Sequence, residues 1–522
     1  MREGAVVAVV LLVFIVGTAA VSVGAASSQP TPSFRSNFVP VLQSRSGYSS
    51  MLFDPSNGYL YVSDGNVSES VVSVVDGARN IANLTFDSGS STNTDVPLAY
   101  DQSNHLVYVE GISGKEVAII NGTTIIGTLP TSFTLCTPYC NSDPAIFGVD
   151  SFNGLVYVIQ NGGGITIING TVEVGHLDGG CGDISDCTMA IDPSNGVAYI
   201  PNTEANTTSV INGTSLVSSV QVGGSPGAAL FDPANGLVYV TIQNYNYGDK
   251  VAVINGSDLV TTIKVGTAPE KLFFDPTNGY VYVSIYLQNA ISVIEGTSEL
   301  ADIPIGLEGI EPINDPSTGF VYYPNQVDGV SVVNGTKVIG TVHTGIAPAF
   351  ALYNPSNGLV YVSNPGVVNI CVGCGAEPSN IVSLVRGTSF IENVTVGSSP
   401  WLMSFDSVRD WVDVLVANGV SEISPSNAST TSTAGSLSSS ETSPTTTSTL
   451  STTKITSTSP VSSTSAPSSS TSFISTTTIQ TGSVGVPEFP FQLLAVTAFV
   501  TLVVASYLLM GHRRDPIGRS RE

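Results

Sequence analysis

The chain has 522 residues and a net charge of −24, with only 16 lysines and arginines. So few basic residues cannot build a surface that neutralises phosphates, which excludes nucleic acid as an expected partner. Only 11% of the residues are charged, so the surface is not the strongly acidic one of an extreme halophile either.

The N-terminal segment predicts export. An apolar run of 12 residues, Ala5 to Val16, follows the short charged start Met1-Arg2, and small residues continue to Ala26. This pattern is typical of a secretory signal peptide over residues 1–26. A retained anchor, which needs about 20 apolar residues, is the weaker alternative. Export places the rest of the chain where disulfides can form.

A repeat organises residues 37–423, and Leu230 to Gly266 shows its unit most clearly. Short runs rich in β-branched and aromatic residues predict four strands, separated by the turn Asp232–Gly236, a polar loop and the hairpin signal Asn255-Gly256. The apolar positions alternate with period two, which favours strands over helices. The unit is therefore a four-stranded antiparallel sheet.

The turn between the first two strands recurs nine times. The copies are FDPSNGYLYV (Phe53–Val62), YDQSNHLVYV (Tyr100–Val109), VDSFNGLVYV (Val149–Val158), IDPSNGVAYI (Ile191–Ile200), FDPANGLVYV (Phe231–Val240), FDPTNGYVYV (Phe274–Val283), NDPSTGFVYY (Asn314–Tyr323), YNPSNGLVYV (Tyr353–Val362) and FDSVRDWVDV (Phe405–Val414). From Asp54 to Asp406 there are 352 residues over eight intervals, a mean of 44. That period is typical of a β-propeller blade.

The DPSNG-x-x-YV turn and strand, the VSVI-N-G third strand and the closing xVG, as in Gln221-Val222-Gly223, resemble the YVTN-type β-propeller repeat family. The resemblance covers roughly residues 37 to 423 and implies an all-β propeller of the kind found in archaeal and bacterial surface proteins. It implies little about activity, because one propeller fold hosts many functions.

The ninth copy lacks a fourth strand, since it ends after strands expected at Trp401–Phe405, Trp411–Ala417 and Val420–Ile423. The stretch Phe38 to Gln43 aligns with a fourth strand, so we expect it to complete the last blade and to remove the open edges. The count predicts nine blades. Eight blades, with one copy displaced, is the fallback, because most propellers have about 4–8. The two tryptophans, Trp401 and Trp411, are expected to pack between blades.

Long insertions gather on one predicted face, opposite the short turns, and all six cysteines lie in them. The insertions are Asp87–Pro97, Thr131–Ala145, Asp178–Thr188, Thr241–Lys250 and Asn364–Asn380. The cysteines form the close pairs Cys136/Cys140, Cys181/Cys187 and Cys371/Cys374. Outside the cell such pairs favour loop disulfides. A metal at a Cys-x-x-Cys is the alternative, but zinc needs four ligands.

Variable loops on a rigid scaffold often bind ligands, and they also simply tolerate insertions. Asp178, Asp183 and Asp186 cluster near a cysteine pair, where a weak Ca²⁺ site competes with a solvated acidic loop. Tyr245 and Tyr247 are placed to stack on a sugar or to be partly buried. These five residues are the candidate ligand contacts.

Ten Asn-x-Ser/Thr sequons make an exported chain a candidate glycoprotein. They lie at Asn66, Asn83, Asn121, Asn169, Asn206, Asn212, Asn255, Asn334, Asn393 and Asn427. Several coincide with the Asn-Gly of the hairpin between the third and fourth strands. There Asn-Gly also suits a type I′ turn without any sugar.

Catalytic patterns are missing from the sequence. His105, His176 and His343 lie in three different repeats, and there is no HExxH, GxSxG or phosphate-binding glycine loop. Each of eight repeats contributes one aspartate, which we interpret as turn-forming. These are Asp54, Asp101, Asp150, Asp192, Asp232, Asp275, Asp315 and Asp406. The sequence therefore predicts no enzyme, no cofactor and no metal site.

The C-terminal part predicts a spacer and an anchor. Residues 424–485 are rich in Ser and Thr and are expected to be a disordered stalk, either O-glycosylated or a plain linker. Residues 486–522 hold Pro487-Glu488-Phe489, an apolar run over 491–511 long enough to span a bilayer, and a basic end. This tail resembles the archaeal PEF-CTERM sorting signal. The resemblance implies cleavage by an archaeosortase-type enzyme and transfer to a lipid; a single-pass anchor is the alternative.

Together these features predict an extracellular propeller anchored to the cytoplasmic membrane, acting in adhesion or as an envelope structural protein that binds an envelope protein or glycan. An exported enzyme or redox subunit with a site in the propeller channel is the alternative from another class. A component of a surface-layer lattice is the third hypothesis.

Overall fold

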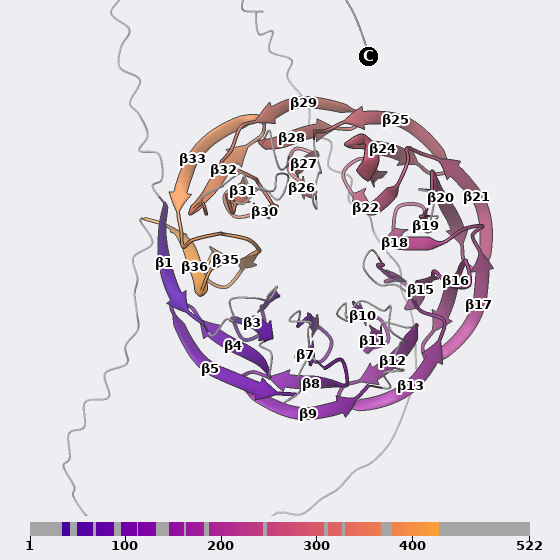
Figure 1. Ribbon diagram of the computed structural model, residues 1–522, viewed down its shortest axis with the longest axis horizontal. Coiled ribbons are helices and arrows are strands. Elements are labelled where there is room, and N and C mark those ends of the chain that lie inside the picture. Colours follow the sequence, from indigo (N-terminus) through magenta and orange to yellow (C-terminus); the bar gives the residue numbers. More distant parts are fainter. Residues whose placement is uncertain are drawn as a thin grey trace, which may run out of the picture. The chain divides into compact units, whose positions relative to one another are not determined.

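A computed structural model describes residues 34–41, 50–65, 69–87, 96–111, 113–131, 146–160, 163–181, 187–243, 248–306, 312–325, 329–366 and 378–426. Within these ranges the chain forms 36 strands in nine four-stranded antiparallel sheets. The sheets stand as blades around a central axis (Figure 1). The fold is thus the predicted all-β propeller with nine blades, and the eight-blade fallback is wrong.

Each of the first eight blades is built from consecutive strands, running outwards from the axis. Blade one has β2 (Met51–Asp54), β3 (Tyr59–Gly65), β4 (Ser70–Asp76) and β5 (Arg79–Phe86). Blade two has β6 (Leu98–Asp101), β7 (Leu106–Glu110), β8 (Glu116–Asn121) and β9 (Thr124–Pro130). Blade three has β10 (Ile146–Asp150), β11 (Leu155–Ile159), β12 (Gly164–Asn169) and β13 (Val172–Asp178). Blade four has β14 (Ala190–Asp192), β15 (Val197–Asn202), β16 (Thr207–Asn212) and β17 (Ser215–Gln221).

The second half of the ring repeats the arrangement. Blade five has β18 (Pro226–Asp232), β19 (Leu237–Ile242), β20 (Lys250–Asn255) and β21 (Asp258–Lys264). Blade six has β22 (Pro269–Asp275), β23 (Tyr280–Ile285), the 3₁₀ turn η1 (Tyr286–Gln288), β24 (Ala290–Glu295) and β25 (Ser298–Pro304). Blade seven has β26 (Ile313–Asp315), β27 (Phe320–Asn325), β28 (Gly329–Asn334) and β29 (Lys337–Val342). Blade eight has β30 (Phe350–Asn354), β31 (Leu359–Asn364), β32 (Ile381–Arg386) and β33 (Ser389–Thr395).

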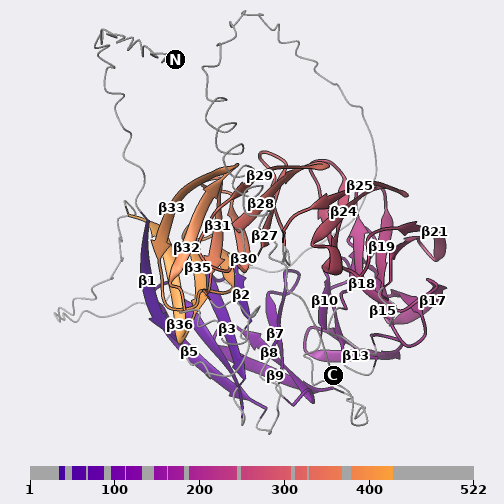
Figure 2. The ribbon, with the colours of Figure 1, turned by 45° about the horizontal axis from the view of Figure 1, so that its top comes forward.

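Blade nine joins the two ends of the propeller. It contains β34 (Met403–Asp406), β35 (Trp411–Val416), β36 (Gly419–Pro425) and, as its outermost strand, β1 (Phe34–Pro40). Figures 1 and 2 show β1 at the outer rim beside β36. The N-terminal strand therefore completes the last blade, as predicted.

The closing strand lies earlier in the sequence than the expected stretch Phe38 to Gln43. It pairs from Phe34 opposite Pro425 to Pro40 opposite Gly419. The physical reason is that Phe34 is part of the packing, with its ring edge-on to Tyr361 at 6.2 Å between centroids. As a result the propeller extends beyond the predicted limits of 37 and 423, and the first two residues expected in the stalk belong to β36.

The core lies between the blades. The second and third strands of each blade are covered on both faces, so they are nearly continuous apolar runs, as in β19 and β20. One cluster shows the principle, since Tyr239 and Val253 of blade five pack against Val281 and Val283 of blade six. In the outer strands, as in β9, exposed and half-buried residues alternate. Successive side chains point to opposite faces of the blade, and only one of these faces meets a neighbouring blade.

The repeated turn motif ties each blade to the next. In blade five the Asp232 carboxylate accepts a hydrogen bond from the Ala234 N–H (2.8 Å), and Asn235 donates from Nδ2 to the Tyr239 hydroxyl (3.1 Å). The Tyr239 hydroxyl donates in turn to the Gly296 carbonyl of blade six at 2.8 Å. The motif residues are thus explained by blade packing.

The same tyrosine bond recurs at four other boundaries. The donors are Tyr61, Tyr108, Tyr157 and Tyr282, and each bonds a hairpin glycine carbonyl at 2.9–3.0 Å. Burial raises the pKa of all four tyrosines to about 12, so each hydroxyl keeps its proton for the bond at neutral pH.

The hairpins between the third and fourth strands differ from the expected type I′ turn. Asn121 pairs with Thr124, so the loop residues are Gly122 and Thr123, and only Gly122 has a positive φ (58°). A type I′ turn needs positive φ at both loop residues, whereas glycine in the first loop position is the pattern of type II′. The glycine is needed for its backbone conformation, because nothing lies within 4 Å of a Cβ built there.

Three predicted segments fall outside the described residues: the signal peptide over 1–26, the stalk from residue 427 on and the apolar run over 491–511. In the part of the chain that is described, no helix is long and apolar enough to cross a membrane.

Candidate functional site

The propeller has two unlike faces. The first, here called the hairpin face, carries the turns between first and second strands and those between third and fourth strands; the opposite one, here called the loop face, carries the remaining connections. The eight repeat aspartates lie on the hairpin face, and each accepts a hydrogen bond from the N–H two residues later at 2.8–3.0 Å. Their interpretation as turn-forming residues is confirmed.

On the loop face Cys181 and Cys187 form a disulfide, with their Cα atoms 6.4 Å apart. Both cysteines are buried, and they pack with Ile159 and Ile165 in the cluster between blades three and four. This pair therefore fixes the connection between two blades as well as its own loop. The other four predicted disulfide residues, Cys136, Cys140, Cys371 and Cys374, lie outside the described residues.

Of the five candidate ligand contacts, the structure describes one. Asp178 ends β13 with its side chain 98% exposed, and its Oδ1 lies 3.8 Å from Nε2 of His176. Asp183, Asp186, Tyr245 and Tyr247 lie outside the described residues. Among the described residues no group of three His, Cys, Asp or Glu is arranged to hold a metal ion. A weak Ca²⁺ site and a solvated acidic loop therefore both remain predictions for this segment.

Eight of the ten sequon asparagines are described, and all eight are exposed: Asn83, Asn121, Asn169, Asn206, Asn212, Asn255, Asn334 and Asn393. Five of them lie on the hairpin face. The threonine of one of these sequons also packs against the preceding blade. Thr214 approaches Gly175 of that blade so closely that a Cβ added to the glycine would lie 3.2 Å from it. Asn66 and Asn427 lie outside the described residues.

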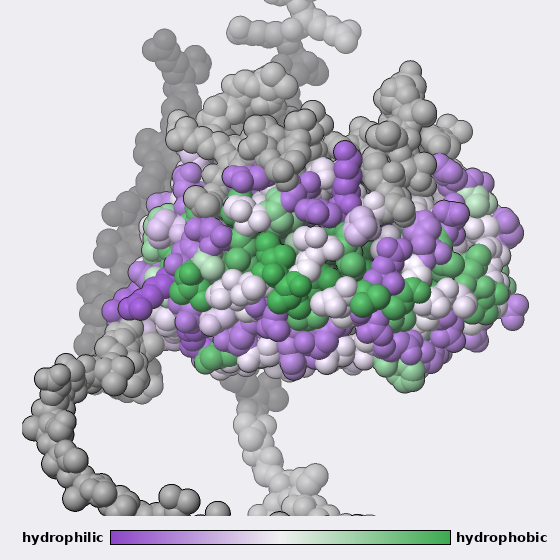
Figure 3. Space-filling view, turned by 90° about the horizontal axis from the view of Figure 1, so that it is seen from below, coloured by the Kyte–Doolittle hydropathy of each residue, from purple (hydrophilic) through white to green (hydrophobic). Residues whose placement is uncertain are grey.

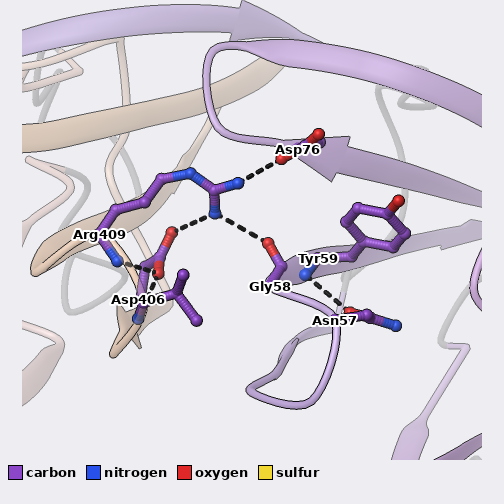
Figure 4. A network of polar contacts seen from close by, with 7 residues as sticks. Asn57, Gly58, Tyr59, Asp76, Asp406 and Arg409 are labelled. Atoms are coloured by element: carbon purple, nitrogen blue, oxygen red, sulfur yellow. Dashed lines mark hydrogen bonds and ion pairs between the residues drawn. The ribbon is translucent and has the colours of Figure 1, made fainter. Parts of the chain in front are cut away.

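Arg409 marks the boundary where blade nine meets blade one, and its role was not predicted. It stands where seven of the other eight repeats have the motif asparagine and the seventh repeat has Thr318. Its Nη1 donates to the Gly58 carbonyl (2.8 Å) and to Asp406 Oδ2 (2.8 Å), and its Nη2 is paired with Asp76 (Figure 4). An ion-paired arginine thus replaces the Asn–Tyr–Gly bridge at the closing boundary.

Two buried acids accompany this arginine. Asp413 takes the position of the motif tyrosine, lies directly opposite Glu422 of β36, and both residues are less than 5% exposed. Burial raises the pKa of Glu422 to about 7. Burial and the neighbouring Glu422 hold the pKa of Asp413 well above its usual range. Since these groups are enclosed between blades, we interpret the cluster as a structural feature of ring closure.

The sequence did contain a signal for this cluster. Among its departures from the motif, the ninth repeat has Arg409 and Asp413 in place of Asn and Tyr. The hairpin it faces carries Asp76-Gly77 where most repeats have Asn-Gly. Three coordinated departures at one boundary indicate that the exchanged residues contact one another.

The aromatic and histidine candidates lie apart from one another. Trp401 lies in the connection to blade nine on the loop face and is 42% exposed, so the predicted packing between blades does not cover its ring. Trp411 of β35 is only partly exposed, in agreement with that prediction. His105 is bound to the Tyr100 hydroxyl through Nδ1 at 2.9 Å, in a different blade from His176 and His343.

Comparisons with known proteins give only distant structural similarities. No protein family profile matches the sequence, and no curated protein matches it. Similar solved structures include the dihydro-heme d1 dehydrogenase NirN in complex with DHE, at 16% identity over 63% of this chain and 72% of that chain, with a TM-score of 0.45. Kuenenia stuttgartiensis hydrazine synthase is 11% identical over 56% of this chain and 98% of that chain (TM-score 0.38).

The C-terminal WD40 domain of Sif2 is 9% identical over 75% of this chain and 99% of that chain, with a TM-score of 0.43. At such identities these similarities carry no conclusion about activity. The fold and the repeated residues define the class of this protein, a nine-bladed β-propeller whose repeated polar residues hold its blades together.

Proposed function

We propose that this chain is a YVTN-like, archaeal-type surface protein whose propeller binds a cell-envelope protein or glycan through its loop face. One observation carries the proposal: the two ends of the propeller leave at the same point. Phe34, the first residue of β1, is paired with Pro425, the last residue of β36. The segments before and after the propeller therefore attach side by side at the rim of blade nine.

That point belongs to the hairpin face. Phe34 packs on Tyr361, whose hydroxyl accepts from Asn357 of the turn between β30 and β31 (3.0 Å). The predicted leader and the Ser/Thr-rich spacer thus continue the chain from the face with the short turns. Both attachment points lie away from the loop face, where the five long insertions begin and end, and loops on a rigid scaffold are where binding residues usually lie.

The predicted signal peptide and C-terminal anchor supply the location, on the outer side of the cytoplasmic membrane. Anchoring is through the helix over 491–511, or through a lipid after cleavage by an archaeosortase-type enzyme at the PEF-like motif. The exposed sequons on the hairpin face fit glycosylation of an exported chain, because a bulky sugar there would cover no part of the loop face.

Trp401, whose ring is partly exposed, is a candidate contact residue for such a partner, since aromatic rings stack on sugars and anchor protein interfaces. We would label the full-length protein and titrate it onto whole cells, with and without enzymatic deglycosylation. Saturable binding that is weakened by Trp401→Ala supports the proposal. The matched control is Val408→Ala, an exposed residue of the same blade on the hairpin face, which should not change binding.

Absence of saturable binding at tens of micromolar, about −6 kcal/mol, would refute the adhesion function. Loss of binding after deglycosylation would identify a glycan as the ligand. A haem, quinone or metal that co-purifies in stoichiometric amount would instead support the alternative of an exported enzyme or redox subunit.

A further inference from the structure

An apolar ring runs around the outside of the propeller. The outermost strands of blades one to eight each expose one large aliphatic side chain at the equivalent position, five residues after the start of the hairpin. These residues, here called the rim belt, are Ile81, Ile126, Val174, Val217, Val260, Leu300, Ile339 and Ile391, with exposed fractions of 40–58%. Figure 3 shows apolar residues along the waist of the rim, with polar residues on either side.

Each rim-belt residue is the extra residue of a β-bulge. In blade five Val253 pairs with Thr261 and Ile254 pairs with Leu259, which leaves Val260 without a partner in the ladder. The same register shift occurs between the third and fourth strands of all eight of these blades. A bulge re-aims a side chain, here away from the blade and outwards.

Strand propensity does not explain the pattern. Two residues beyond each bulge the next outward position is polar in every one of the eight strands: Asn83, Thr128, His176, Ser219, Thr262, Asp302, Thr341 and Asn393. A preference for β-branched residues in strands would favour Val and Ile at both positions equally. The belt is therefore bounded by polar residues on its loop-face side.

The belt is wider on four of these blades. Val172, Leu216, Leu259 and Phe390, on the hairpin side of the bulges of blades three, four, five and eight, are also exposed. On blade nine, which has no such bulge, the 50% exposed ring of Phe38 continues the belt on β1. Contiguous exposed apolar surface on a protein usually marks a contact with another molecule.

We propose that the rim belt is the surface through which copies of this chain contact one another side by side. The repetition argues for this occupant: a single foreign partner needs one patch, whereas identical patches on eight blades offer a copy the same contact in every direction around the rim. Such contacts are not limited to one closed pair and extend into sheets.

The distribution of charge also allows copies to contact one another at the rim. The whole chain carries −24, so copies repel one another. At the rim belt and the next outward positions, however, the only ionisable side chains are those of His176 and Asp302. Contact at these positions therefore brings few charged side chains together. The bulges also interrupt each outer edge, which opposes pairing by strand addition and leaves side-chain packing as the mode of contact.

The test is to measure self-association of the full-length protein by sedimentation velocity over a concentration series. The variant Val174→Thr, Val217→Thr, Val260→Thr keeps three β-branched side chains but makes each polar. The matched control, Ser219→Thr with Thr262→Ser, changes neighbouring outward positions on two of the same strands. We expect concentration-dependent association, weakened roughly tenfold or more by the first variant and unchanged by the control.

Two results would overturn the proposal: a protein that stays monomeric at concentrations up to roughly 0.5 mM, or association that the belt variant leaves unchanged. At roughly 0.5 mM even a small, weak interface forms a detectable fraction of complex. If the belt variant has a lower melting temperature than wild type, Leu300→Thr with Ile339→Thr on the next two blades replaces it. This test is independent of the proposed loop-face ligand, since cell binding by a monomer would leave that proposal standing.

Discussion

Replacing Glu422 by glutamine should stabilise this protein at neutral and alkaline pH. Buried Glu422 lies close to the carboxylates of Asp413, Asp406 and Asp76, and among the described residues the cation that lowers its pKa is Arg409. Its folded-state pKa of about 7 lies above the usual value of 4.5. The folded state therefore holds the proton more strongly than the unfolded state, and the free energy of unfolding falls as pH rises from about 4.5 to 7.

The size of the effect follows from the shift. One pKa unit corresponds to about 1.4 kcal/mol, so the shift of Glu422 from 4.5 to about 7 costs the folded state about 3 kcal/mol once the carboxylate is ionised. Glutamine cannot ionise, and its Oε1 can still accept the hydrogen bond that Asn37 donates to Glu422 (3.3 Å). At about 2 cal/mol/K of unfolding entropy per residue, over roughly 390 residues, 3 kcal/mol raises the melting temperature by about 4 °C.

The assay is thermal unfolding of wild type and Glu422→Gln from pH 4 to 9, compared as a difference at each pH, so that carboxylates that do not interact with Glu422 cancel. The difference should be near zero at pH 4.5 and grow to its full value above pH 7. Glu173→Gln, on the exposed strand β13, is the control and should give a flat difference. A Glu422→Gln variant that is no more stable than wild type at pH 8 would refute this reasoning.

Three further outcomes are expected. Arg409→Met leaves a buried carboxylate without its cation at the closing boundary, so the denaturation midpoint should fall by the equivalent of about 2–4 kcal/mol; the exposed Arg386→Met should cost less than about 1 kcal/mol. Tyr239→Phe removes one inter-blade hydrogen bond and should cost about 1–1.5 kcal/mol in the same assay, and a neutral result would contradict the packing role of the motif. Cys181→Ser with Cys187→Ser should cost about 2 kcal/mol in calorimetry under oxidising conditions, and the difference from wild type should vanish after reduction.

The sequence contained most of the fold because the fold repeats. A motif such as Asp232–Gly236 followed by Tyr239 needs only local chemistry to form a turn and a strand, and nine copies at a mean spacing of 44 residues imply nine blades. The missing fourth strand of the last copy, together with an unassigned strand before the first, predicted how the ring closes. For the hairpins the same local reasoning gave the wrong turn type, because Asn121 pairs with Thr124 and Gly122 is therefore the first loop residue, not the second.

The contacts between blades depended on the tertiary structure. Nothing local indicates that the hydroxyl of Tyr239 reaches a carbonyl 57 residues away, or that Arg409 reaches Asp76 across the closing boundary. The rim belt is likewise invisible as a sequence pattern, because its residues continue ordinary β-rich runs until the bulges turn them outwards. Sequence by itself determined the unit and its number, since these follow from short-range patterns. Only the ring, in which residues hundreds of positions apart become neighbours, decided which polar groups close the propeller and which apolar ones remain on its surface.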